Sequence, residues 1–314
     1  MNKNLFNILF AAIILTFTAC DNPGRTAAGE TVSVQHELGT AQVPVQPRRV
    51  VVFDVGTLET LDELHIPVVG IPKDYMAKHL EKYRKDPNVQ DAGSIIQPNL
   101  ERVNQIKPDL VVISAVTSRE YEQLSKIAPT IYLGVKNENY MQSVIDNLNT
   151  IGDIFGVRDK TDQKVAEIER KIETAVKTIS ASPKKSMVLM YNAGAFSTFG
   201  NNSRYGFLYT DLKAVPADEN KQAGVHGTVV SSEYISRVNP DILYIIDRNE
   251  IMLGEKTDKK EIENALIQKT NAFKNNRIIH VDPNVWYLSG GGTYSLNRML
   301  DDVLKGYESL PRHP

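Results

Sequence analysis

The chain has 314 residues, of which 41% are hydrophobic and 24% are charged, a composition that predicts a folded globular protein rather than a disordered one. Its 36 basic and 38 acidic side chains leave a formal net charge of −2, which gives no basic surface to argue for nucleic-acid binding. The single cysteine, Cys20, excludes an internal disulfide, a CxxC zinc or redox site, and an iron–sulfur cluster held by several thiolates.

The first residues of the chain have the layout of a bacterial export signal. Lys3 gives a positive start, an apolar run extends from Leu5 to Phe17, and small residues precede Cys20. The run is too short for a spanning helix with normal flanks, so we expect residues 1–19 to be removed as a signal peptide. A cysteine at the cleavage point is typical of a lipoprotein, whose thiol receives a lipid, although Phe17 stands where leucine is usual. An ordinary signal peptide with a chance cysteine is the alternative.

Acyl chains on Cys20 would anchor the mature protein firmly, because each buried methylene contributes about 0.8 kcal/mol. Asp21 follows the cysteine, a residue that tends to keep Gram-negative lipoproteins at the inner membrane. For a Gram-negative host we therefore expect a periplasmic protein that is lipid-anchored to the inner membrane. Residues 20–45 are polar and rich in Gly, Thr and Ala, and we interpret them as a tether that leads into the first strand.

Residues 46–158 predict a first α/β lobe. An apolar run over 48–53 is typical of a buried parallel strand, a short helix with leucines on one face follows over 58–64, and a second strand follows over 67–71. This order is a βαβ unit. The same alternation continues with predicted helices over 100–105 and 121–127 and predicted strands over 110–114 and 130–133.

Residues 182–314 predict a second lobe that repeats the pattern. The turn Pro240-Asp241 lies between a predicted helix over 232–237 and an apolar strand over 242–246, as Pro108-Asp109 does in the first lobe. Aspartate suits such a turn because its carboxylate accepts backbone N–H bonds. Two such turns, each between a helix and a buried strand, predict two lobes of like topology.

Residues 159–181 predict one long helix between the lobes. Apolar residues recur in it at spacings of three and four, which gives a single apolar stripe, and the other faces are charged. The helix ends just before a predicted strand over 187–191, so we interpret it as a brace across both lobes; a surface helix of one lobe is the alternative. The fold class is therefore α/β, with two lobes of parallel-sheet topology bridged by one long α-helix.

The cleft between two such lobes is where ligands are expected, outside the carboxyl ends of the strands. Three strand ends each deliver one arginine there, namely Arg119, Arg204 and Arg248. One arginine at a strand end is ordinarily a solvated surface charge. Three at equivalent positions favour an anionic ligand with several oxygen acceptors.

His226 and Tyr287 also lie in loops, the latter after a predicted strand over 277–281 and just before the glycine run 290–292. That run suits a mobile, close-approach loop or the entry to the last helix. A lone histidine and a tyrosine beside Trp286 are both compatible with simple core packing. As a pair, imidazole and phenolate are plausible ligands for ferric iron, a hard ion that favours phenolate oxygen.

The sequence contains no GxSxG elbow, no P-loop, no HExxH motif and no GxGxxG after a strand. We therefore expect a binding protein rather than an enzyme, with no intrinsic cofactor. A zinc or manganese carrier would need three or four histidine and carboxylate ligands. Six histidines without a histidine-rich tract support such a carrier poorly.

Four segments of the chain resemble the siderophore-binding lipoproteins of ABC-type iron importers, which are helix-bridged periplasmic substrate-binding proteins. The similarity covers essentially the whole chain after the tether, and it is greatest to members that bind ferric catecholates of the enterobactin type. The segments are VVFDVGTLETL at 51–61, GSIIQPNLE at 93–101, VHG at 225–227 and WYL at 286–288.

The resemblance implies that an arginine triad faces the anionic catecholates, and that a histidine and a tyrosine complete the iron shell when a tetradentate siderophore leaves two positions open. The matching residues are Arg119, Arg204 and Arg248 for the siderophore and His226 and Tyr287 for the iron, with Gln97 and Tyr205 as weaker neighbouring candidates. Ferric iron then enters as part of the ligand.

The resemblance also implies partners. The loaded protein, expected to be a monomer, would dock on a permease dimer with its ATPase through acidic residues on the outer surface of each lobe, for which we suggest Glu59 and Glu219. A carrier of haem, cobalamin or another iron chelate such as a hydroxamate remains an alternative. So does a lipid-anchored enzyme that acts on a siderophore.

Overall fold

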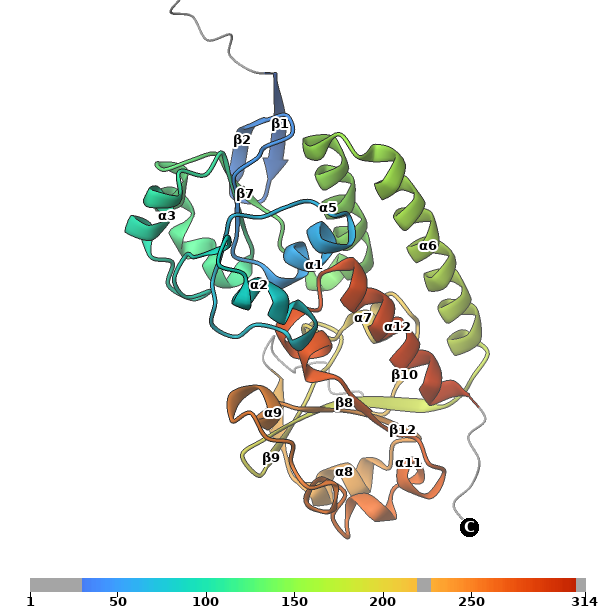
Figure 1. The fold of residues 1–314 in the computed structure, drawn as a ribbon. Coiled ribbons are helices and arrows are strands. Elements are labelled where there is room, and N and C mark those ends of the chain that lie inside the picture. Colours follow the sequence, from blue (N-terminus) through green and yellow to red (C-terminus); the bar gives the residue numbers. More distant parts are fainter. Residues whose placement is uncertain (1–29, 219–226, 309–314) are drawn as a thin grey trace, which may run out of the picture. The chain divides into compact units, whose positions relative to one another are not determined.

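The computed structural model describes residues 30–218 and 227–308 of the chain (Figure 1). Cys20, Glu219 and His226, which the sequence singled out, lie outside the described residues. Within the described ranges, no helix combines the length and the apolar character needed to cross a membrane.

The first lobe is built on a five-stranded parallel sheet. Its strands follow one another as β5 (Gln90–Asp91), β4 (Gly70–Ile71), β3 (Val50–Val52), β6 (Leu110–Ile113) and β7 (Thr130–Tyr132). Every residue of β3 and β6 is buried, as their unbroken apolar sequences predict. The helices of this lobe are α1 (Val55–Glu63), η1 (Lys78–Leu80), α2 (Glu81–Lys85), α3 (Leu100–Ile106), η2 (Ala115–Glu120), α4 (Tyr121–Ser125), η3 (Asn137–Asn139) and α5 (Tyr140–Phe155).

A β-hairpin precedes this sheet, formed by the antiparallel strands β1 (Thr31–His36) and β2 (Gly39–Pro44). These residues fall in the range 20–45 that we expected to be a tether, so the fold begins earlier than the expected 46. The side chains of each strand point alternately to its two faces, and this alternation explains the difference. It turns Val34 and Val43 to one face, where both are buried in the core. The polar residues between them hide this pattern in the composition.

The second lobe is built on a six-stranded mixed sheet. Its parallel part consists of β8 (Lys185–Asn192), β10 (Val215–Pro216), β12 (Ile242–Asp247) and β13 (Ile278–Val281), and its antiparallel part of β9 (Ala195–Thr198) and β11 (Thr228–Val230). We expected a parallel sheet here. The chain reverses instead because Ala193 and Gly194, with φ of 48° and 83°, form a two-residue hairpin turn between β8 and β9.

The helices of the second lobe lie between and after these strands. They are α7 (Phe207–Thr210), α8 (Ser232–Val238), α9 (Asn249–Met252), α10 (Lys259–Ile262), η4 (Ile267–Lys269), α11 (Asn271–Lys274), the π-helical segment η5 (Asn284–Ser289) and α12 (Thr293–Tyr307). The last of them, α12, packs against α1 of the first lobe and against β12 and β13 of the second, so this helix contacts elements of both lobes.

The predicted bridging helix is present as α6 (Arg158–Ser180), which follows α5 and ends before β8 (Figure 1). Lys164 Nζ lies 2.9 Å from Glu63 Oε2 on α1, and Lys171 Nζ lies 2.7 Å from Asp301 Oδ1 on α12. The helix thus makes ion pairs with α1 of the first lobe and with α12 of the second. These contacts support a helix that bridges the two lobes rather than a surface helix of one lobe.

The two Pro-Asp turns hold equivalent places in the two sheets. Asp109 accepts hydrogen bonds from the backbone N–H groups of Arg48 (2.9 Å) and Arg49 (2.8 Å), and Asp241 accepts one from the backbone N–H of Lys185 (2.9 Å). We expected these carboxylates to bond within their own turns. They bond instead to the start of the neighbouring strand, and so fix the register of β6 beside β3 and of β12 beside β8.

One hydrophobic core runs through both lobes. It contains Leu61 of α1, Ile168 of α6, Trp286 of η5 and Leu300 of α12, all of them buried. Alternate residues of the central strands point into two smaller clusters on the opposite sheet faces, as Val111 does in the first lobe and Leu243 in the second. The shared core joins the lobes by side-chain packing as well as by α6.

Candidate functional site

A pocket of about 350 Å³ is lined by residues of both lobes. The first lobe contributes residues 54–55, 114–116 and 133–135, which directly follow β3, β6 and β7. The second lobe contributes Arg204, Arg248 and part of η5, which follow β9, β12 and β13. The pocket therefore lies outside the carboxyl ends of the central strands, where the sequence predicted the ligand.

Arg204 and Arg248 converge on Tyr287 in this pocket. Arg204 Nη2 donates to the backbone carbonyl of Tyr287 (2.9 Å), and Arg248 Nε donates to its phenol oxygen (2.8 Å). Both guanidinium carbons lie 5.3 Å from the centroid of the tyrosine ring. Arg248 Nη1 also donates to the side-chain oxygen of Asn192 at the end of β8 (2.9 Å), so its orientation is fixed from two sides.

The charges of these two arginines are not neutralised within the described part of the chain. Both side chains are half-buried, and among the described residues no carboxylate forms an ion pair with either of them. Their hydrogen bonds go to neutral oxygens instead. A half-buried guanidinium with neutral partners keeps its charge for an anionic ligand.

Large apolar side chains line the pocket and are exposed in it. Tyr75 (46% exposed), Ile96 (65%) and Val116 (54%) come from the first lobe, and Met252 (39%) comes from the second. Exposed apolar groups in a concave site suit a ligand with apolar or aromatic surface. We did not single out these residues from the sequence, although the pair Ile95-Ile96 in an otherwise polar loop was a signal.

Two polar residues of the pocket were also missed. The Ser289 hydroxyl oxygen is buried and has no hydrogen-bond partner in the part of the chain that the structure describes. Asp54 caps α1, and its Oδ2 accepts hydrogen bonds from the Thr57 backbone N–H (2.6 Å) and hydroxyl (2.8 Å). An aspartate directly before a helix is ordinarily an N-cap, so its residue type alone gives no signal of a place in the pocket.

Three other candidate residues do not line the pocket. Arg119 is exposed at the end of η2, whose first residue Ala115 does line it, and Gln97 is exposed beside the lining residue Ile96. Tyr205 is 1% exposed, and its hydroxyl donates to the backbone carbonyl of Trp286 (3.1 Å). Burial raises the pKa of Tyr205 to about 12, so this residue is a packed core phenol and not a pocket residue.

Of the suggested iron pair, the structure places Tyr287 in the pocket, whereas His226 lies outside the described residues. Of the suggested acidic docking pair, Glu219 also lies outside them, and Glu59 is 1% exposed. The suggestion for Glu59 was wrong, because a carboxylate this deeply buried presents nothing to a partner.

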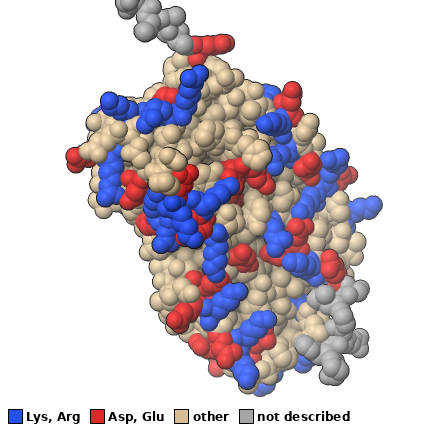
Figure 2. All heavy atoms as spheres, in the orientation of Figure 1, with Lys and Arg blue, Asp and Glu red and all other residues tan. Residues whose placement is uncertain are grey.

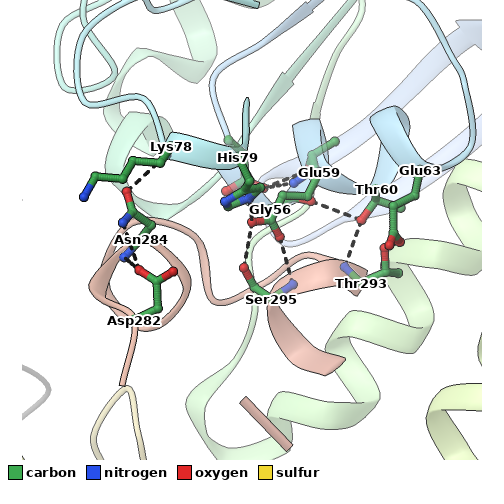
Figure 3. A network of polar contacts seen from close by, with 12 residues as sticks. Gly56, Glu59, Thr60, Glu63, Lys78, His79, Asp282, Asn284, Thr293 and Ser295 are labelled. Atoms are coloured by element: carbon green, nitrogen blue, oxygen red, sulfur yellow. Dashed lines mark hydrogen bonds and ion pairs between the residues drawn. The ribbon is translucent and has the colours of Figure 1, made fainter. Parts of the chain in front are cut away.

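Glu59 belongs instead to a polar network that joins α1 to α12 (Figure 3). Its Oε1 accepts a hydrogen bond from the Ser295 hydroxyl (2.6 Å) and lies 2.6 Å from His79 Nε2, and its Oε2 accepts from the Ser295 backbone N–H (3.2 Å). The His79 ring stacks on Tyr294 at 4.6 Å between centroids. Every oxygen of this buried carboxylate therefore has a partner, as burial of a charge requires.

The two lobes also touch through glycine backbones. A methyl group at Gly56 would lie 2.6 Å from the backbone nitrogen of Gly292, and one at Gly292 would lie 2.4 Å from the carbonyl oxygen of Gly56. The Thr293 backbone N–H donates to the Thr60 hydroxyl beside this contact (3.2 Å, Figure 3). Gly292 thus serves the close approach and helix entry that we expected, in a contact between lobes.

The surface carries both signs of charge. Over most of the face seen in Figure 2, basic and acidic side chains lie next to one another, as the net charge of −2 suggests. Interspersed charges do not form the continuous basic track that a nucleic acid requires.

Comparisons with known proteins agree with this architecture. Residues 50–285 match the family described as periplasmic binding protein. The petrobactin-binding protein YclQ of Bacillus subtilis is 41% identical over 96% of this chain and 99% of the relative, and its crystal structure, which covers 90% of this chain and all of its own, gives a TM-score of 0.85. The ferric-anguibactin-binding protein FatB of Vibrio anguillarum is 35% identical over 98% of this chain and 100% of the relative.

A third similar protein is the periplasmic catecholate-siderophore binding protein VctP of Vibrio cholerae. Its crystal structure has a TM-score of 0.84 and 31% identity, and the match covers 88% of this chain and 100% of VctP.

Proposed function

Because the chain belongs to the periplasmic binding protein family, which consists of transport proteins and not enzymes, we propose that it is the siderophore-binding component of an ABC iron importer and that its ligand is a ferric catecholate. The observation that carries this proposal is the convergence of Arg204 and Arg248 on Tyr287 in a pocket lined by both lobes. The relatives named above are named for petrobactin, ferric anguibactin and a catecholate siderophore.

The chemistry of the pocket suits a ferric catecholate on two counts. Catecholate oxygens are anionic acceptors, so the two arginines attract them and donate charge-assisted hydrogen bonds. The catechol rings are flat and apolar, and Ile96, Val116 and Met252 offer exposed apolar surface for them. Arg119, exposed one turn beyond the pocket wall on η2, would attract the ligand from the mouth of the site.

Iron ligation by Tyr287 and His226 extends this proposal to siderophores that leave two coordination positions open. Arg248 Nε already donates to the phenol oxygen of Tyr287, and a phenolate oxygen keeps lone pairs for iron while it accepts this bond. Both protein ligands bind iron only when deprotonated, so the affinity for a ferric bis-catecholate falls as the pH drops from 7.5 to 5. An affinity that is constant over this range would remove the two residues from the iron shell.

Location and partners follow from the family and the export signal. The family is extracytoplasmic, and relatives include proteins named as lipoproteins. We propose that Cys20 carries a lipid anchor, at the inner membrane if the host is Gram-negative, and that the monomer delivers its cargo to a permease dimer with its ATPase. Enterobactin-like siderophores and their bis-catecholate breakdown products are the proposed cargo.

A fluorescence titration of residues 21–314 tests the function. Trp286 is fully buried next to Tyr287, and a coloured ferric catecholate in the pocket would quench it. We expect sub-micromolar quenching by ferric enterobactin and by a ferric bis-catecholate, and none by ferrichrome or haemin. The double variant His226→Ala with Tyr287→Phe should weaken binding of the bis-catecholate more than that of ferric enterobactin, which leaves no iron position open.

Two outcomes contradict the proposal. Tighter binding of haemin or ferrichrome than of either catecholate would assign the pocket to a different iron chelate. Equal affinity of the double variant for the bis-catecholate would keep the carrier function and reduce His226 and Tyr287 to packing residues.

A further inference from the structure

The two walls of the pocket differ in the sign of their charge. Among the described residues that line it, Arg204 and Arg248 are the charged side chains of the second lobe, and Asp54 is the charged side chain of the first. A ligand that is anionic over its whole surface would meet two attractive groups on one wall and a repulsive one on the other. The pocket therefore suits a ligand whose own charge changes sign from end to end.

Asp54 has an unused acceptor. Its Oδ2 receives both hydrogen bonds from Thr57, whereas no hydrogen bond or ion pair reaches Oδ1 from any residue that the structure describes. The side chain is half-buried just after β3, and Oδ1 is not among the fully buried polar atoms that lack a partner, so it is open to a ligand in the pocket. A carboxylate oxygen in this state is a strong acceptor for a cationic N–H group.

An aromatic ring accompanies this carboxylate. Tyr75 lines the pocket with Asp54, and the two residues also line a smaller cavity next to it together with Ile95. Tyr75 is 46% exposed. Its backbone has a φ of +37°, a conformation that non-glycine residues rarely adopt. The carboxylate of Asp74 accepts a hydrogen bond from the Ile95 backbone N–H (3.3 Å), which ties this loop to the pocket wall.

We propose that Asp54 and Tyr75 form a subsite for a protonated amine carried by the siderophore, while Arg204 and Arg248 hold the anionic ferric centre. Asp54 Oδ1 accepts a hydrogen bond from the ammonium group, and the ring of Tyr75 provides a cation–π face beside it. The inference rests on the proposed function, because it assigns a second binding group to the same ligand. It also adds a preference, among ferric catecholates, for those with a basic linker or side arm.

The test compares two ferric chelates that differ by one acetyl group, which removes one positive charge. Both carry two catecholamide groups on one linker; the linker of the first contains a secondary amine, which is protonated at neutral pH, and the second is the same compound with that amine acetylated. Each is titrated into the wild-type protein and into Asp54→Asn, which keeps an N-cap acceptor for α1 and removes the charge. Asp258→Asn is the matched control, because Asp258 also caps a helix but does not line the pocket.

We expect the wild-type protein and Asp258→Asn to bind the amine form about tenfold more tightly than the acetylated form, and Asp54→Asn to lose this preference. Tyr75→Leu should reduce the preference by about two- to threefold. An unchanged preference in Asp54→Asn, or equal binding of both chelates by the wild-type protein, would overturn the amine subsite and leave the carrier function standing. If neither chelate binds the wild-type protein, the proposed function itself fails and the inference fails with it.

Discussion

The two lobes share one helix–turn–strand motif and differ in the residues that they present to the pocket. In each lobe a helix ends on a residue in the left-handed conformation, Lys107 after α3 and Asn239 after α8, both with a φ of 52°, and a Pro-Asp turn then leads into a buried parallel strand. The loops after the strands differ between the lobes, because those of the first present Asp54 and apolar side chains to the pocket and those of the second present two arginines and Met252. The repeated motif thus fixes the sheets, and the loops after the strands supply the chemistry.

The sheets themselves differ at one edge. The second lobe reverses at Ala193-Gly194 and adds the antiparallel strands β9 and β11, whereas the five-stranded sheet of the first lobe is parallel throughout. The reversal leads the chain through β9 directly to the loop that holds Arg204. The turn at Ala193-Gly194 thus changes the edge of the second sheet, and the segment after β9 brings a charged residue into the pocket without any change in the repeated helix–turn–strand motif.

The largest effect is expected where the two lobes touch. Gly292→Ala places a methyl group 2.4 Å from the Gly56 carbonyl oxygen and 2.3 Å from a carboxylate oxygen of Glu59, so we expect a loss of about 3 kcal/mol in the free energy of unfolding. Urea denaturation measures it. Gly254→Ala is the control, since no atom would lie within 4 Å of its methyl group and only its φ of +77° opposes the change. Equal losses in the two variants would show that the contact between lobes can relax.

The next effect separates an arginine inside the pocket from one outside it. Arg248→Ala removes a charged donor that is held in place by Tyr287 and Asn192, so we expect about a thirtyfold loss in affinity for a ferric catecholate, or about 2 kcal/mol. Arg119→Ala, exposed outside the pocket, should cost less than about threefold. Arg170→Ala on α6 serves as a control for the loss of one positive charge. If Arg119→Ala proves as costly as Arg248→Ala, the ligand extends beyond the pocket to η2.

A smaller effect is expected from the polar network between the lobes. Glu59→Gln keeps the shape of the side chain and removes the charge that faces His79 and Ser295, so the free energy of unfolding should fall by about 1 to 2 kcal/mol. Glu101→Gln, on the exposed face of α3, is the control and should change it by less than about 0.5 kcal/mol. Equal urea midpoints for Glu59→Gln and Glu101→Gln would mean that the polar network does not stabilise the contact between the lobes.

The smallest effect concerns the β1–β2 hairpin of the first lobe. Burial lowers the pKa of His36, so the unfolded chain takes up a proton more readily than the folded one, and the stability contributed by the neutral ring declines as the pH falls below about 6.5. His36→Phe preserves the edge-to-face contact with Tyr121 and has no titrating group. Urea midpoints measured on either side of this pH should shift less in His36→Phe than in the wild-type protein. The same shift in both would assign the acid sensitivity to other residues.

Much of the fold could be predicted because its signals are local. Unbroken apolar runs identify β3, β6 and β12, a stripe at helical spacing identifies α6, and the two Pro-Asp turns identify the repeat. The β1–β2 hairpin and the antiparallel edge of the second sheet were missed for different reasons. The hairpin buries only alternate residues of a polar segment, and the edge depends on a turn at Ala193-Gly194 whose backbone angles are not visible in its composition.

The part of the site that lies at strand ends was predictable from the sequence. Arg248 and Tyr287 follow β12 and β13, whose carboxyl ends lie side by side, so position along the chain was enough to bring them together. Arg204 follows the antiparallel strand β9, which was not predicted. Tyr205 shows the limit, because adjacent residues point in different directions: its ring lies in the core, whereas the side chain of its neighbour Arg204 lines the pocket. Which side of a loop faces the ligand is decided by tertiary packing.

The docking of α12 on α1 has a consequence for biosynthesis. Thr60 and Glu59 receive their hydrogen bonds from residues that lie 233 and 236 positions later in the chain. In a nascent polypeptide of this protein, His79, Tyr83 and Lys164 can contact the first helix early, but its contacts with Thr293 and Ser295 wait until those residues have been synthesised. Such late closure delays folding, and an incompletely folded chain is the form that a secretion channel threads.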